Sequence, residues 1–374
     1  MKFRVICLLT ALLLCVPARA AEPAPEIQAR ATVVLHPETG RVLYEKNADA
    51  FLPIASTTKI MTALVVLERC DLSETVTIQP EDTAVEGSSM SLRPGETVTV
   101  EQLLYGLMLR SGNDAALALA RYTAGSTEAF AELMNDKAAS LGLKQTHFCN
   151  PHGLDAEGHG STARELARLA AAAMENDVFR SIVSTERKAF GNQIYVNHNR
   201  LLRTYPGALG VKTGYTRAAG RILVSCAERE GTRFVCVTIS DPDDWADHTA
   251  LLDWAFASFR WQTLDGVAYT LPVVSGTASA CAVLPEGSSG LLLKTGERAA
   301  ITAELPRFVF APLRPGDAVG TLTAAAPDGE RVTVPLVSAG AVEADETLPL
   351  SFPERLGRFW RLAGRAVFSF QPRF

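Results

Sequence analysis

Residues 55–64 read Ala-Ser-Thr-Thr-Lys-Ile-Met-Thr-Ala-Leu, at the point where a helical pattern begins. From Ser56 to Arg69 the apolar residues recur at helical spacing, which predicts an amphipathic helix. Ser56 and Lys59 are three residues apart, so their side chains lie on one face of the first turn. A lysine whose pKa is lowered by burial or by a second cation can take the proton of a serine hydroxyl and activate it as a nucleophile. A serine that caps a helix, followed by a surface lysine, gives the same pattern, so this pair alone decides nothing.

Two further short motifs follow along the chain. Ser111-Gly112-Asn113 lies between two helical patterns, in a loop that can project a serine and an asparagine into a cleft, although a turn that ends a helix reads the same. Lys212-Thr213-Gly214 lies on a predicted strand, where its glycine lets a ligand approach the backbone closely. Its lysine supplies positive charge, and its threonine supplies a hydroxyl donor for a carboxylate. A second such triplet, Lys294-Thr295-Gly296, has no nucleophile partner in sequence order and is set aside.

The patterns around these motifs predict one α/β domain over about residues 22–262, with strands at both ends of its sequence and helices between them. Strands are expected within 30–46, 210–215, 222–227 and 234–239, and helices over 101–109, 114–124, 126–141, 162–176 and 246–259. From Leu264 onward, short apolar runs alternate with Pro, Gly and Asp-Gly turns. This texture predicts a small all-β domain over 264–345.

The two ends of the chain differ from the rest. Residues 1–20 combine a basic start, a short apolar run and Ala18-Arg19-Ala20, which is typical of a signal peptide that is cleaved after export. Over 353–374, arginines fall on one helical stripe and Leu, Phe and Trp on another. This predicts a basic amphipathic helix that attaches the exported protein peripherally to the anionic surface of the cytoplasmic membrane. A terminal helix docked on the protein itself is the alternative.

The composition excludes several classes of protein. With 47% hydrophobic and 21% charged residues it is ordinary for a globular chain, which rules out disordered and collagen-like chains. The formal net charge is −5, and the body of the chain carries no basic stripe. Nucleic acid is therefore not expected as a partner.

The cysteines and histidines point to neither a disulfide framework nor a metal site. An odd number of scattered cysteines remains once residues 1–20 are removed, which favours buried free thiols, although Cys226 and Cys236 could face each other across a hairpin. The spacing of His147, His152 and His159 fits no standard set of metal ligands. We therefore expect no metal and no cofactor.

In this order, the three motifs form the S-x-x-K, S-x-N and K-T-G set of active-site serine enzymes that react with penicillin. The chain resembles the family of D-alanyl-D-alanine carboxypeptidases, the low-molecular-mass penicillin-binding proteins. Residues 55–64, 110–116, 150–155 and 210–216 carry the resemblance, which is close over about 30–260 and looser beyond. It implies an α/β fold of the penicillin-binding and β-lactamase-like serine transpeptidase type: an antiparallel sheet flanked by helices with a helical subdomain, followed by a small all-β domain and a C-terminal amphipathic helix.

The resemblance also implies a reaction. The substrate would be the D-Ala-D-Ala terminus of a peptidoglycan stem peptide, and β-lactam antibiotics would be acylating inhibitors. Ser56 would attack the carbonyl between the two D-alanines, with Lys59 as its base. Ser111 would relay a proton to the leaving D-alanine, and water would then release the acyl-enzyme.

The substrate-binding residues implied by the resemblance are Asn113, Lys212, Thr213, Gly214 and Tyr215. Asn113 would contact the acyl part of the peptide, and Lys212 would hold the charge of the network. Thr213 would bind the terminal carboxylate. The backbone N–H groups of the nucleophile and of Tyr215 would form the oxyanion hole, in which each donor contributes about 10²- to 10³-fold in rate.

Two stretches depart from the family pattern. Residues 241–245 read Asp-Pro-Asp-Asp-Trp, where family members often carry an arginine close to the carboxylate site. Carboxylate recognition is then expected to rest on Thr213 and Lys212, with Arg217 or Arg221. A histidine, His198, stands between two asparagines where some members have arginine, so it is expected either to border the cleft or to be a neutral structural residue.

Three other functions are considered for a chain with these motifs. A β-lactamase needs a second base for fast deacylation, and the nearest match, Glu132, lies inside a helical run. A D,D-endopeptidase would use the same machinery on cross-linked peptides. A catalytically silent, membrane-attached scaffold protein is disfavoured, because such a protein has no reason to keep all the residues of the three motifs.

Overall fold

The computed structural model describes residues 23–345. The expected signal peptide, 1–20, and the expected amphipathic helix, 353–374, lie outside the described residues. None of the helices within 23–345 has an apolar stretch of the length needed to span a lipid bilayer.

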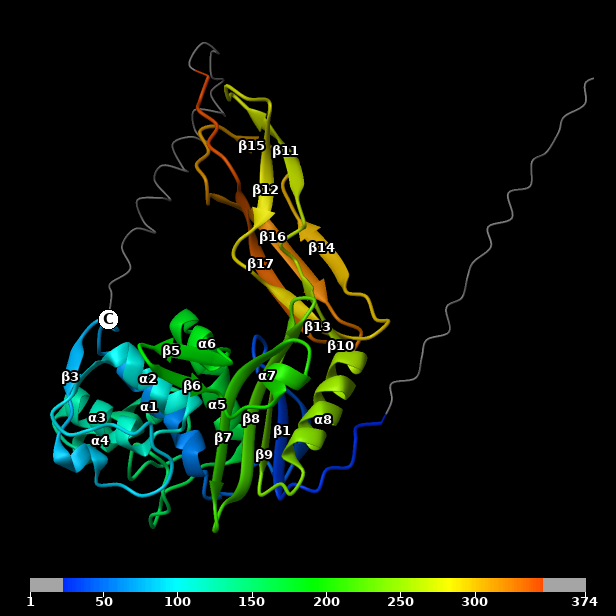
Figure 1. Ribbon diagram of the computed structural model, residues 1–374. Helices are drawn as coiled ribbons and strands as arrows, with labels where there is room; N and C mark the ends of the chain where they lie inside the picture. The colour runs from blue at the N-terminus through cyan, green and yellow to red at the C-terminus, as the bar shows by residue number, and fades with distance from the viewer. Residues whose placement is uncertain (1–22, 346–374) are drawn as a thin grey trace, which may run out of the picture.

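A five-stranded antiparallel sheet forms the centre of the larger region (Figure 1). Its order is β2-β1-β9-β8-β7, so that β7 lies at one edge. The strands are β1 (Ala31–His36), β2 (Arg41–Lys46), β7 (Ala208–Thr216), β8 (Gly220–Arg229) and β9 (Thr232–Ile239). The five strands that the alternation predicted are therefore present. The two ends of the domain meet in the middle of the sheet, where β1 pairs with β9.

Both faces of the sheet are covered, which is why its inner strands are almost continuously apolar. Along β9, Val235 and Val237 pack into the apolar cluster on the helical side, whereas Phe234 and Cys236 pack into the cluster beneath α8 (Asp244–Ser258). Cys226 points to the helical side, and Ser225 is the residue that pairs with Cys236. The two cysteines thus lie on opposite faces of the sheet as buried free thiols.

The helical subdomain packs around α1 (Lys59–Leu67), in which every residue from Lys59 to Val66 is buried. A helix that is apolar on all sides belongs in a core. The helix expected from Ser56 to Arg69 is therefore present but buried on more than the one apolar face that the spacing indicates, and its first turn is a separate 3₁₀ helix, η1 (Ala55–Thr58). The surrounding helices are α2 (Val100–Leu109), α3 (Asn113–Ala124), α4 (Thr127–Ser140), α5 (Ala163–Met174) and α6 (Asp177–Val183).

Short elements complete this region. They are β3 (Thr75–Thr77), η2 (Pro80–Thr83), β4 (Thr97–Thr99), β5 (Arg187–Phe190), β6 (Gln193–Val196) and α7 (Leu201–Thr204). The antiparallel pairs β3–β4 and β5–β6 have three and four residues per strand, too short for an alternation to be recognised in the sequence.

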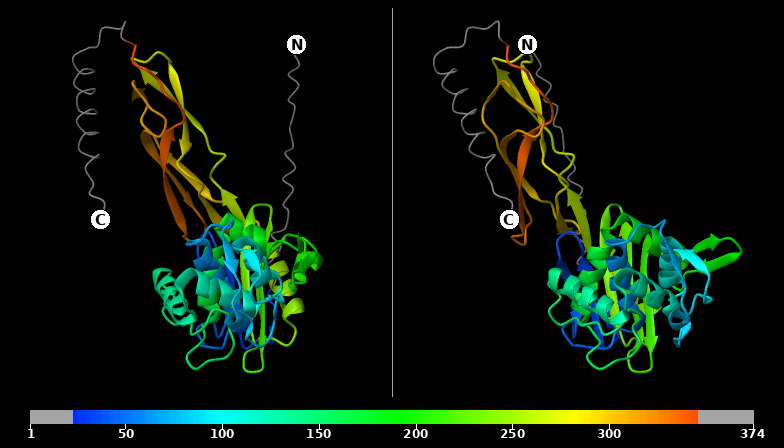
Figure 2. Two further views of the ribbon diagram at one scale, coloured as in Figure 1. Left: turned by 60° about the vertical axis from the view of Figure 1, so that its left-hand side comes forward. Right: turned by 90° about the vertical axis from the view of Figure 1, so that its left-hand side faces the viewer.

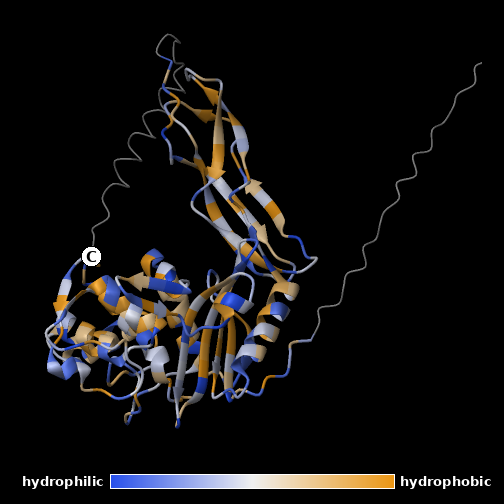
Figure 3. Ribbon diagram, viewed as in Figure 1, coloured by the Kyte–Doolittle hydropathy of each residue, from blue (hydrophilic) through white to orange (hydrophobic). Residues whose placement is uncertain are grey.

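The C-terminal region is all β and extends away from the end of α8 (Figures 1 and 2). A two-stranded sheet pairs β10 (Phe259–Thr263) with β13 (Gly290–Lys294), and a six-stranded sheet has the order β14-β16-β17-β12-β11-β15. Its strands are β11 (Tyr269–Val274), β12 (Ala280–Pro285), β14 (Ala300–Glu304), β15 (Val309–Phe310), β16 (Ala318–Ala325) and β17 (Arg331–Ser338). Figure 3 shows apolar and polar residues alternating along these strands, as expected for a sheet with one face in a core and the other in solvent.

The distribution of cysteines gives a test of the packing. In protein lacking residues 1–20, we expect a thiol reagent to modify the exposed Cys149 quickly and the buried Cys226, Cys236 and Cys281 only after unfolding. Burial raises the pKa of Cys226 to about 12 and that of Cys236 well above its ordinary value, so neither forms the reactive thiolate. Stopped-flow reaction with and without denaturant, beside a Cys149→Ser control, measures this. Fast modification of Cys226 or Cys236 in the native protein would contradict the burial of these thiols on the two faces of the sheet.

Candidate active site

Lys59 lies at the centre of the site with its side chain fully buried, at 0% exposure. Its Nζ is within hydrogen-bond distance of three oxygens: Ser56 Oγ at 3.0 Å, Asn113 Oδ1 at 2.7 Å and the carbonyl oxygen of His152 at 2.6 Å. Burial, and next to it the charge of Lys212, lower the pKa of Lys59 well below its ordinary value. A neutral amine has two hydrogens and one lone pair. When Lys59 is neutral, Asn113 and the carbonyl oxygen of His152 can accept both hydrogens, and the lone pair is then left for the hydroxyl of Ser56.

The backbone brings Ser56 to this amine through a short, strained turn. Ala55, just before it, has a φ of 45°, a left-handed conformation that costs energy for a residue with a Cβ. Gly153 packs against this turn so closely that a Cβ there would lie 1.9 Å from the carbonyl oxygen of Ala55. Gly214 lies against it from β7, since its Cβ would be 3.3 Å from the backbone nitrogen of Ser56. The nucleophile candidate is thereby held at the edge of the sheet.

Asn113 is fixed from two sides. Its Oδ1 faces Lys59, and its Nδ2 donates to the carbonyl oxygen of Glu86 at 2.6 Å. The chain passes so close that Gly87 is needed: a Cβ there would lie 2.8 Å from Asn113 Nδ2, and its φ is +91°. The next residue, Asp114, accepts hydrogen bonds from the backbone nitrogens of Met90 and Leu92 at 3.0 and 3.1 Å. No local sequence pattern indicates these loop contacts, because they depend on tertiary structure.

Lys212 is the second buried cation, at 2% exposure. Burial lowers its pKa to about 7, and its Nζ donates to the carbonyl oxygen of Thr213 at 2.9 Å. Because Lys212 and Lys59 are both desolvated and repel each other, the pair disfavours having both side chains charged.

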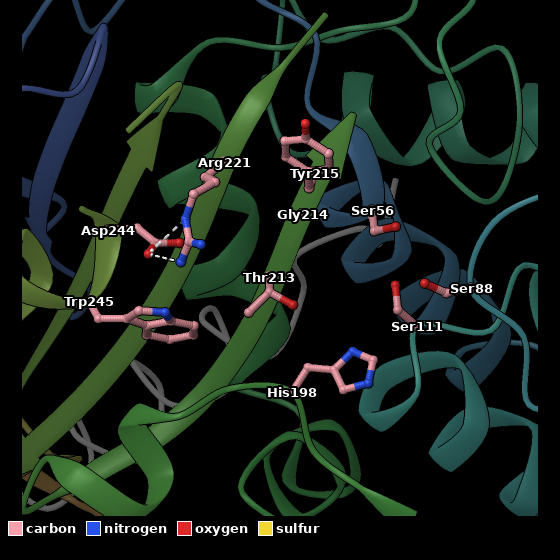
Figure 4. Close-up of a pocket in the computed structure, with 10 residues that line it drawn as sticks. All are labelled: Ser56, Ser88, Ser111, His198, Thr213, Gly214, Tyr215, Arg221, Asp244 and Trp245. Carbon is pink, nitrogen blue, oxygen red and sulfur yellow. Dashed lines mark hydrogen bonds and ion pairs between the residues drawn. The ribbon is translucent and has the colours of Figure 1, made fainter. Parts of the chain in front are cut away.

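A cavity of about 520 Å³ opens above these buried groups (Figure 4). It is lined by Ser56, Ser88, Ser111, His198, Thr213, Gly214, Tyr215, Arg221, Asp244 and Trp245. Of the residues predicted for the site, five line the cavity, while Lys59, Asn113 and Lys212 are buried. Tyr215 is 66% exposed. Ser88 and Trp245 are lining residues that the motifs had not indicated.

The sequence is similar to those of a known enzyme family. The sequence model of the D-alanyl-D-alanine carboxypeptidase family matches residues 18–243. The chain belongs to this family. It is 40% identical to the D-alanyl-D-alanine carboxypeptidase DacB2 of Mycobacterium tuberculosis over 63% of this chain and 84% of the relative. It is 36% identical to DacC of Escherichia coli over 80% of each chain.

Solved structures of carboxypeptidases share the fold. Penicillin-binding protein 5 from Haemophilus influenzae superposes with a TM-score of 0.68 and 28% identity, covering 86% of this chain and 99% of that one. The expected fold class, an antiparallel sheet with helices followed by an all-β region, is therefore confirmed.

The structure shows where the arginine candidates for carboxylate binding and His198 lie relative to the cavity. Arg221 lines the cavity and forms an ion pair with Asp244, whereas Arg217 is exposed and is not among the lining residues. His198 borders the cavity, and burial, followed by the charges of Lys212 and Arg110, lowers its pKa.

Glu132 and His159 are both outside the set of residues that line the cavity. Glu132 lies within α4 and not along the cavity, so it does not occupy the place of a second base. No group of three potential metal ligands occurs within 23–345. His159 instead has a structural contact at each ring nitrogen: Nδ1 accepts from the backbone nitrogen of Cys149 at 3.0 Å, and Nε2 is 2.8 Å from Thr58 Oγ1.

The buried His159 predicts a sensitivity to acid. Burial lowers its pKa from 6.5 to about 4, so the unfolded chain binds more protons between these values and stability falls as the pH drops from 6.5 to 4. The measurement is the urea concentration at the unfolding midpoint at pH 7 and at pH 4.5. We expect this midpoint to fall less in the His159→Gln variant than in the parent. Lys144→Gln, at an exposed position, serves as the control and keeps the parental dependence. Equal losses in all three proteins would contradict a buried, neutral His159.

Proposed function

We propose that this protein is an exported serine-type D-Ala-D-Ala carboxypeptidase that removes the terminal D-alanine from peptidoglycan stem pentapeptides. The observation that carries the proposal is the buried Lys59 amine, whose Nζ lies 3.0 Å from Ser56 Oγ and has two further acceptors in Asn113 and His152. Membership of the carboxypeptidase family supports the choice of substrate.

Acylation begins when Ser56 Oγ attacks the carbonyl carbon between the two D-alanines and Lys59 accepts its proton. The backbone N–H groups of Ser56 and Tyr215 stabilise the oxyanion, and the close approach of Gly214 to Ser56 supports this pairing. Ser111 relays the proton from Lys59 to the nitrogen of the leaving D-alanine, so that Lys59 is neutral again. The bond to that nitrogen breaks, and the acyl group remains on Ser56.

The remaining groups bind and position the substrate. Lys212 holds positive charge beside the proton relay, and Asn113 contacts the acyl peptide while it fixes Lys59. Thr213 donates its hydroxyl to the terminal carboxylate. A water molecule then attacks the ester, with Lys59 again as base, and releases the shortened peptide.

The location of the enzyme follows from the ends of its sequence. We propose that residues 1–20 direct export and that 353–374 attach the protein peripherally to the cytoplasmic membrane. β-Lactam antibiotics would acylate Ser56 in place of the peptide. The β region would then serve as a spacer between the membrane and the catalytic region, which its elongated shape supports (Figure 2).

The proposed function is tested by D-alanine release from diacyl-L-Lys-D-Ala-D-Ala. We expect release by the protein lacking 353–374 and none above background by its Ser56→Ala variant, because Lys59 then has no hydroxyl to activate. Mass spectrometry after incubation with penicillin checks the same serine. Acylation of Ser56 without D-alanine release would overturn the carboxypeptidase assignment, and neither acylation nor release would favour the silent scaffold.

A second prediction concerns the pH dependence of acylation. The charge of Lys212 is one of the causes that lower the pKa of Lys59, so the Lys212→Met variant has a Lys59 with a higher pKa. Because only the neutral amine can accept the serine proton, the acid limb of the acylation rate should move to higher pH in this variant. The measurement is the rate of penicillin acylation against pH, read at the midpoint of the limb. Lys144→Met, at an exposed lysine, should leave that midpoint in place.

A further inference from the structure

One wall of the cavity carries an ion pair that the mechanism above does not use. Arg221 on β8 and Asp244 at the start of α8 lie on the side away from Ser56, Ser88 and Ser111, beside Trp245, and Thr213 lies between the two sides (Figure 4). Arg221 pairs across the sheet with Tyr215 of β7. Strand register therefore places this guanidinium one strand away from the K-T-G motif.

Arg221 is the permanently charged cation among the residues that line the cavity. Lys59 and Lys212 are both buried beneath the surface and have lowered pKa values. The side chain of Arg221 is 45% exposed, and the hydrogen bond to Asp244 raises its pKa, so it stays charged. A carboxylate entering the cavity thus meets a fixed positive charge on this wall.

The geometry of the pair leaves part of the guanidinium available. Nε and Nη2 of Arg221 both donate to Oδ1 of Asp244, whose side chain is only 4% exposed. A guanidinium has five N–H hydrogens, so three remain, including both on Nη1. Within 23–345, Nη1 has no hydrogen-bond acceptor in the protein. Asp244 thus orients the group from its buried side, and the exposed side faces the cavity.

We infer that Arg221, positioned by Asp244, binds the free carboxylate of the substrate's terminal D-alanine, together with the hydroxyl of Thr213. This inference rests on the proposed function, because it assigns the carboxylate of that substrate. The stretch 241–245, acidic where family members often have arginine, here supplies Asp244 as the partner, while the cation comes from the neighbouring strand. The carboxylate subsite therefore consists of an arginine, Arg221, that is held in an ion pair with Asp244.

A purely structural ion pair between β8 and α8 is the competing explanation, so the test must separate charge recognition from folding. We would use two thioester acyl donors with the same N-acyl-D-alanyl group, one with thioglycolate as the leaving group and the other with thioglycolamide. The leaving groups occupy the place of the terminal D-alanine and differ in the carboxylate alone. The reactivity of a thioester keeps the rates measurable for both.

The readout is the ratio of kcat/KM for the thioglycolate donor to kcat/KM for the thioglycolamide donor. We expect Arg221→Ala to lower this ratio by about 10- to 100-fold, the usual effect of removing hydrogen bonds to a charged group. Arg221→Lys should recover part of it, since the charge is kept and the fork is lost. Arg69→Ala, the matched control at an exposed arginine outside the cavity, should leave the ratio unchanged.

Each outcome decides one point. A loss of rate on both donors by the same factor, with a lowered Tm, would overturn the inference in favour of a structural pair. An unchanged ratio with unchanged rates would overturn it as well. If the parent protein cleaves neither donor and releases no D-alanine from the tripeptide, the proposed function itself fails, which is distinguishable because the variants play no part in that result.

Discussion

The desolvation of Lys59 is the constraint on which the rest of the site depends. An amine in this position is useful only when it is neutral, and burial is the largest cause that lowers its pKa. Burial in turn requires that each hydrogen of the amine finds an acceptor, because an unpaired polar group inside a protein is destabilising. Asn113 and the carbonyl oxygen of His152 are those acceptors, and both come from segments far from Lys59 in the chain. The loops around the site are therefore organised to satisfy one side chain.

The edge of the sheet provides the other half of the site. β7 is an edge strand, so one side of its backbone is free of strand pairing and can face a ligand. Gly214 allows this edge to approach the turn that carries Ser56, and Ala55 holds that turn in a strained conformation. Strain of this kind persists only where the surroundings enforce it. Here the close packing of Gly153 against Ala55 and the central position of α1 supply that support.

Much of the architecture could be predicted from the sequence, because it is written in local patterns. The alternation along 222–227 and 234–239 identified β8 and β9, and helical spacing identified α2 to α5. The burial of α1 was missed because the period alone cannot tell a surface stripe from a helix surrounded by protein. Ser88 and the loop contacts of Asp114 were missed for another reason: they depend on contacts between distant segments, which no local pattern records. The three motifs were found because their order along the chain is itself a pattern.

The charges of the site are arranged by depth. Two lysines lie beneath the cavity, where desolvation lowers the pKa of both and the charge of Lys212 lowers that of Lys59 further, which suits Lys59 to proton transfer. An arginine lies on the exposed wall, where its high pKa keeps it ionised and a buried aspartate holds its direction. Exchanging these residue types would weaken both roles, because a buried arginine could not give up its proton and an exposed lysine would keep the charge but lose the planar fork of donors. Depth below the cavity surface therefore assigns proton transfer to Lys59 and a fixed, oriented charge to Arg221.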